Sequence, residues 1–132
     1  MHMKSMIMIQ HITSPRLIEA AGNKPKPIEE FFGRVNSATS EVSIARMTSP
    51  KGWVEPGQTP EFNEYTLVLE GCLRVSTRDE IRDVYAGEAI LVPGGTWIQY
   101  STPHDGGAKY LAVCLPAFSM ETVHRDDTET RE

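Results

Sequence analysis

The chain has 132 residues, a length that fits one domain with its own hydrophobic core. Apolar residues make up 39% and charged residues 23%, which is too apolar for a disordered chain. The net charge of −5 at pH 7 excludes the basic surface that nucleic acid or an anionic membrane requires, so we expect neither as a partner.

The first forty residues give mixed signals. The apolar run within 1–10 is too short for a signal peptide or a membrane span, so we expect a cytoplasmic protein. One short helical turn is predicted over 15–21. Two prolines make 23–27 a loop, because proline donates no backbone hydrogen bond and restricts the residue before it. The stretch 28–32 is predicted to be a turn of helix or an edge strand.

From residue 40 onward the apolar residues recur with a period of two, which is typical of half-buried strands. Strands are predicted over 42–47, 64–69, 72–76, 81–85, 89–92, 96–101 and 109–115. Glycine and proline separate them in a loop at 52–60 and in turns at 70–71, 86–87, 93–95 and 104–107. The charged tail from Glu121 is predicted to fray. This pattern predicts an all-β sandwich or barrel with little helix.

The chain has two cysteines, Cys72 and Cys114, and both lie in apolar, strand-like runs. We expect them to be buried thiols that pack as small apolar side chains. No C-x-x-C pair and no Cys/His spacing of a metal site occurs.

Two blocks of the sequence resemble the two motifs of the cupin family. Glu64, six residues and Gly71 match the end of the first motif, and Gly87, five residues and Pro93 match the start of the second. The resemblance implies a double-stranded β-helix, the cupin jelly-roll barrel, with a small cup between its sheets and often a homodimer. We expect a single cupin domain over 1–132, with an N-terminal arm at 1–39, a barrel core at about 40–118 and a charged tail at 119–132.

The resemblance fails at the metal ligands. A typical cupin binds a divalent metal through an H-x-H pair, a glutamate and a histidine of the second motif. The H-x-H positions fall here on Gln58 and Pro60, or in the neighbouring register on Gly57 and Thr59. Ile98 replaces the last histidine, and isoleucine cannot coordinate a metal. Only Glu64 remains, so we expect no metal and no other cofactor.

Within the cupins, the two blocks are similar to the ethanolamine-utilisation cupin, the Q protein of that operon, which also lacks the histidines. The similar blocks are residues 64–71, E-Y-T-L-V-L-E-G, and residues 92–103, V-P-G-G-T-W-I-Q-Y-S-T-P. The similarity supports a subgroup and does not fix an activity.

The matched position of Glu64 points into the cup, where burial raises the pKa of a carboxyl group unless a partner stabilises its charge. Tyr100 lies two residues after Ile98 and therefore shares its face of the strand. We predict Glu64 and Tyr100 as an acid–base or hydrogen-bonding pair. Gln58 is predicted to contact a polar ligand from the mouth of the cup.

The remaining wall of the cup is predicted to be largely apolar, as in most pockets for small organic molecules. The candidates are Thr66, Val68, Trp97, Ile98, Trp53 and Phe62. Glu55 and Glu61 form a loose acidic cluster with Glu64, which we interpret as a solvated loop.

Three functions are consistent with these residues. The first is a metal-independent cupin that binds a small polar organic molecule in its cup. The second is a cofactor-free enzyme, of isomerase, lyase or cyclase type, with Glu64 as base and Tyr100 as acid. The third is a metal enzyme that recruits His104 or His124 beside Glu64, although we expect both histidines at the surface.

Overall fold

The computed structural model describes residues 8–126. The predictions for the first seven residues and for the tail at 127–132 lie outside the described residues. Nine strands form: β1 (Arg16–Ile18), β2 (Ile28–Phe32), β3 (Ser43–Ser49), β4 (Trp53–Val54), β5 (Asn63–Ser76), β6 (Ile81–Tyr85), β7 (Ala89–Val92), β8 (Gln99–Thr102) and β9 (Ala108–Leu115). The predicted all-β fold is confirmed. Between residues 8 and 126 there is no helix long and apolar enough to cross a membrane.

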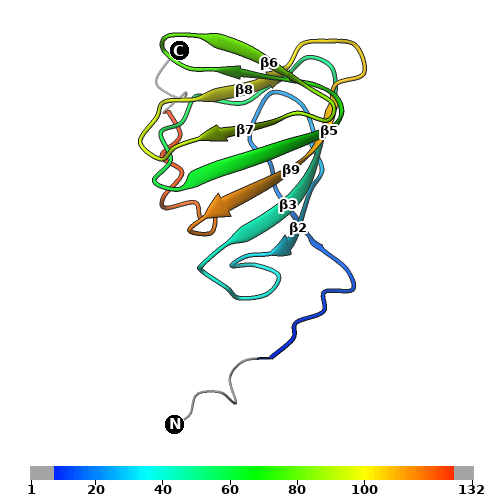
Figure 1. Ribbon diagram of the computed structural model, residues 1–132, viewed down its shortest axis with the longest axis vertical. Helices are drawn as coiled ribbons and strands as arrows, with labels where there is room; N and C mark the ends of the chain where they lie inside the picture. The colour runs from blue at the N-terminus through cyan, green and yellow to red at the C-terminus, as the bar shows by residue number, and fades with distance from the viewer. Residues whose placement is uncertain (1–7, 127–132) are drawn as a thin grey trace.

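Strand β5 organises the sheet because each of its halves has two neighbours. Its first half pairs with β7 and β9, and its second half pairs with β6 and β8, all antiparallel. Beyond β9 the sheet continues through β3 and β2 to β1. The sheet curls around an interior, and β5 and β9 lie side by side in its middle (Figure 1).

A bulge lets β5 run through the position where the sequence predicted its end. Gly71 has a φ of +78°, and its pairing register with β9 shifts between Val68 and Glu70. A Cβ atom at Gly71 would collide with the carbonyl oxygen of Gly107. Glycine is therefore needed here for a close backbone approach inside a strand, and not for the predicted turn.

Alternate residues of β5 face the interior, as the period of two predicted. Thr66 and Val68 are buried, whereas Tyr65 and Leu67 face outward. The main core contains Trp53, Val68, Leu73, Val75, Val84, Val92, Ile98, Tyr100, Ala108 and Tyr110. The prediction of two free, buried thiols is also confirmed, since Cys72 and Cys114 are both buried and unpaired.

Three local predictions were wrong. Arg16–Ile18 is a strand and not a helical turn, because it pairs antiparallel with β2. The predicted loop at 52–60 contains β4, which pairs with β8. The tail does not fray from Glu121, because Val123 is buried in a small second core with Phe62. Each correction comes from pairing or packing with a segment far away in the sequence.

Candidate functional site

A cavity of about 60 Å³ lies on the inner face of the sheet. A dry cavity of about 150 Å³ holds benzene, so this one accepts a molecule of only a few non-hydrogen atoms. Its polar lining includes Lys26, Glu55, Gln58, Glu64, Tyr100 and Arg125. Residues from both ends of the described chain therefore meet over the inner face of β5.

Glu64 lies at the start of β5, between Val92 of β7 and Cys114 of β9. Burial raises the pKa of its carboxyl group to about 7, and the charge of Glu55 acts in the same direction. The positive charge of Lys26 opposes this rise. The carboxyl group of Glu64 therefore changes between its protonated and its ionised form near neutral pH.

Glu55 is a second carboxyl group in the cavity, and the prediction that it belongs to a solvated loop was wrong. It follows β4, and its backbone is fixed to β8 by hydrogen bonds to Tyr100 and Gln99. The side chain is buried, and this burial raises the pKa of its carboxyl group against the lowering effect of Lys26. Glu61, in contrast, is exposed.

Two cations, which the sequence analysis missed, also line the cavity. Lys26 is buried, with its ammonium group 3.9 Å above the centre of the Trp53 ring. Arg125 forms an isolated β-bridge with Gln58 and lies beside Phe118. Lys26 belongs to a proline-rich loop and Arg125 to a charged tail, so no sequence pattern marks either residue as internal.

Four polar side-chain atoms of the cavity have no hydrogen-bond partner among the described residues. They are Glu55 Oε2, Gln58 Oε1, the Tyr100 hydroxyl and Arg125 Nε. Gln58 and Tyr100 are each only 5% exposed, so water does not solvate them freely. A buried polar group without a partner costs about 1–3 kcal/mol, and such groups in a native protein call for an explanation.

All sequence-predicted site residues except Trp97 fall into two sets. Glu64, Tyr100, Gln58 and Phe62 line the cavity. Thr66, Val68, Ile98 and Trp53 are buried but do not line it, and the last three belong to the main core. An inward-facing position on a strand was therefore not enough to predict which side chains line the cavity and which belong to the core.

Trp97 lies away from the cavity. Its indole Nε1 donates a hydrogen bond of 3.0 Å to Asp126, and the guanidinium group of Arg78 lies 4.1 Å from its ring centre. Trp97 also covers Gly57, where any side chain would collide with the indole ring. The Trp97 side chain therefore packs against neighbouring loops, outside the cavity.

The cavity does not offer the donor set of a cupin metal site. No histidine of residues 8–126 lines it; His104 bonds to Asp83 and His124 to Glu61, the latter at 2.6 Å. Across residues 8–126, no group of three potential metal ligands includes Glu55 or Glu64. The positive charges of Lys26 and Arg125 instead oppose the rise in the pKa of Glu55 and Glu64.

Comparison with known proteins supports the fold. No family model matches the chain. A putative ethanolamine utilization protein Q from Salmonella typhimurium covers 79% of this chain and 97% of its own, with 19% identity and a TM-score of 0.62. The EutQ protein of Clostridium difficile covers 78% of this chain and 74% of its own, with 21% identity and a TM-score of 0.61.

An oxalate decarboxylase variant from Bacillus subtilis covers 86% of this chain and 31% of its own, with 18% identity and a TM-score of 0.70. The chain therefore has the cupin fold, a double-stranded β-helix, as the sequence predicted. Among cupins it resembles the EutQ structures.

One relative in the comparison is named as an endoribonuclease. The chain is 41% identical over 106 residues to the endoribonuclease YbeY of Myxococcus xanthus. The match covers 80% of this chain but only 36% of that protein. The match therefore spans about a third of the length of that relative.

Proposed function

We propose that the chain is a cupin that binds a small polar organic molecule in the cavity without the help of a metal ion there. The observation that carries this proposal is the convergence of four unpartnered polar atoms on one small cavity. A ligand that bonded to these atoms would remove their desolvation cost.

The unpartnered atoms indicate which hydrogen-bonding groups a ligand of this cavity should carry. Tyr100 and Arg125 offer donors and Glu55 and Gln58 offer acceptors, while Lys26 adds a positive charge. Such a lining suits a small acid or amino alcohol that carries both acceptor and donor groups. Oxalate, glycolate and ethanolamine have the appropriate size, and the names of two structural relatives refer to ethanolamine and oxalate.

We expect at least one of these three probes to bind the purified protein, as measured by isothermal titration calorimetry and thermal shift. Lys26→Met and Glu64→Gln should each change its affinity by about tenfold or more, since each alters a charged contact in a desolvated site. Lys24→Met and Glu41→Gln serve as controls, because these side chains are exposed. Binding that all four variants preserve would contradict the assignment of the cavity.

The alternative is a cofactor-free enzyme with Glu64 as general base and Tyr100 as general acid. The observation in its favour is the pKa of Glu64 near 7, since a base works best near the pH of operation. The pKa of Tyr100 is raised well above its usual value, by burial and by the charge of Glu64, so the hydroxyl keeps its proton. This alternative requires a turnover that both Glu64→Gln and Tyr100→Phe abolish in folded protein, whereas a binding module has none to lose.

We also propose that the chain is a cytoplasmic homodimer, joined through an apolar patch on the outer face of β5, β7 and β9. The patch consists of neighbouring residues on adjacent strands: Tyr65 pairs with Leu91 and Val113, and Leu67 pairs with Ala89 and Leu111. Tyr65, Leu67 and Leu91 are 43%, 41% and 47% exposed. A contiguous apolar patch of this kind commonly marks a protein interface.

Leu67→Lys is expected to convert the dimer into a monomer, as measured by size-exclusion chromatography with light scattering. A lysine at the centre of an apolar interface leaves an unpaired charge out of water. Ile81→Lys is the matched control, because Ile81 is an exposed apolar residue on β6, outside the patch. A monomeric wild type, or a dimer that Leu67→Lys leaves intact, would refute the interface.

For the relative named as an endoribonuclease, we propose that this chain corresponds to a ligand-binding portion and not to the portion that cleaves RNA. A net charge of −5 disfavours a polyanion, and the cavity of about 60 Å³ is too small for a nucleotide. The purified chain is expected to leave RNA intact in a gel assay. Cleavage that Glu64→Gln abolishes would show the opposite.

A further inference from the structure

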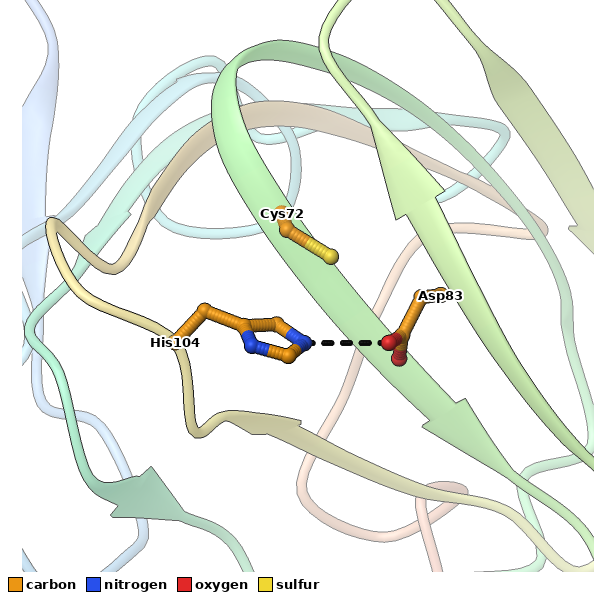
Figure 2. A group of neighbouring side chains, drawn as sticks. All are labelled: Cys72, Asp83 and His104. Atoms are coloured by element: carbon orange, nitrogen blue, oxygen red, sulfur yellow. Dashed lines mark hydrogen bonds and ion pairs between the residues drawn. The ribbon is translucent and has the colours of Figure 1, made fainter.

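Three side chains with metal-binding atoms meet on the outer side of the barrel. Cys72 comes from β5, Asp83 from β6 and His104 from the turn after β8 (Figure 2). One ligand atom of each residue lies within 4.8 Å of the others. None of the three residues lines the cavity, so this cluster is separate from the proposed ligand site.

Strand register explains how the cluster forms. Cys72 pairs with Tyr85, and Arg74 pairs with Asp83, so the side chains of Cys72, Arg74 and Asp83 lie on one face of the β5–β6 pair. The backbone amide of Cys72 donates to the carbonyl oxygen of Gly107, at 3.2 Å, which brings the turn containing His104 over this face. The close contact between Gly71 and Gly107 makes this approach possible.

Hydrogen bonds from Arg74 stabilise the charged form of Asp83. Arg74 donates from Nε to Oδ1 at 2.8 Å and from Nη2 to Oδ2 at 3.1 Å. These bonds, helped by His104, lower the pKa of Asp83 to about 2. His104 Nε2 lies 3.0 Å from Asp83 Oδ2, and the sulfur of Cys72 projects toward the same space (Figure 2). An ion-pair network accounts for Arg74, Asp83 and His104, and the free thiol of Cys72 lies beside this network.

We propose that Cys72, Asp83 and His104 bind one zinc-type divalent cation, with a water molecule in the fourth position. Thiolate, imidazole and carboxylate are the usual protein ligands of zinc. Tetrahedral zinc holds such ligand atoms about 3.3–3.8 Å apart, so separations between 3.0 and 4.8 Å need only small side-chain rotations. Arg74 then orients Asp83 from outside the coordination sphere, and the thiol proton is released to solvent on binding.

Titration of chelator-treated protein with Co²⁺ tests the site directly, because cobalt bound to a thiolate gives a charge-transfer absorption in the near ultraviolet. We expect one Co²⁺ per chain with this band, displaced by Zn²⁺. His104→Gln should weaken binding by about tenfold or more, and Cys72→Ala should abolish the band. The matched controls, Cys114→Ala and His124→Gln, should retain both, because Cys114 lines the cavity and His124 pairs with Glu61.

Two results would overturn the proposal: no band at stoichiometric Co²⁺, or a band that persists in Cys72→Ala. Because His104 is a turn residue whose side chain is 44% exposed, His104→Gln keeps the test valid if Cys72→Ala fails to fold. Elemental analysis of protein purified without chelator adds a second readout. Metal that is lost in His104→Gln and retained in Glu64→Gln belongs to the outer cluster, and the reverse pattern assigns it to the cavity.

Discussion

Raising the pH from about 5 to about 8 is expected to destabilise the folded protein by about 2–3 kcal/mol through Glu64 alone. The pKa of this carboxyl group is about 7 in the folded state, against 4.5 as the reference value for the unfolded chain. Between these two values the folded state binds more protons than the unfolded state. The stabilisation is therefore complete below the unfolded pKa and is lost as pH rises through the folded pKa.

Chemical denaturation at several pH values measures this dependence. Glu64→Gln should remove most of the slope, because glutamine is close in shape to the protonated carboxyl group and cannot ionise. Some slope should remain, since burial raises the pKa of Glu55 in the same direction. Glu41→Gln removes one charge from an exposed position and should keep the slope of the wild type. A stability that increases with pH through this window would refute the description of the cavity.

Trp53→Ala is expected to destabilise the protein by about 3–5 kcal/mol, the usual cost of removing a large aromatic side chain from a core. Trp53 has no exposed surface and belongs to the main core. Its indole Nε1 donates to the carbonyl oxygen of Ala21, and its ring supports the ammonium group of Lys26. The substitution therefore removes packing, a hydrogen bond and the platform under one cation of the cavity.

Trp97→Ala is the matched control, with an expected loss of about 1 kcal/mol or less. Trp97 is only half-buried, and its indole bonds to Asp126 near the end of the described chain. Denaturant unfolding monitored by circular dichroism measures both variants on one scale. Equal losses would mean that the two tryptophans have similar packing, against the structure.

The sequence predicted those parts of the fold and site that depend on local pattern. The period of two located most strands, and the inward face of β5 placed Glu64 at the cavity. The two cupin-like blocks predicted the barrel. Their glycines lie where the fold needs an irregular backbone, such as the bulge at Gly71. Gly71 illustrates the limit of this reasoning, since a glycine alone does not distinguish a turn from a bulge.

What the sequence could not predict depends on segments that meet from far apart. Lys26 becomes internal only because β1 and β2 extend the sheet around the cavity. Glu55 becomes internal because β8 fixes its backbone. Cys72, Asp83 and His104 are 11 and 21 residues apart and have no motif spacing, yet strand register brings them together.

The charged residues that line the cavity come from different parts of the chain. The two carboxyl groups whose pKa is raised, Glu55 and Glu64, belong to the proposed barrel core at about 40–118. Both cations lie in the flanking segments, Lys26 before this core and Arg125 after it, and Glu19 and Glu30 also line the cavity from the N-terminal flank. In evolution, substitutions confined to the two flanking segments could therefore reverse the charge preference of the cavity while every barrel residue stayed the same. Relatives with nearly identical barrels but different flanks should then bind different classes of molecule.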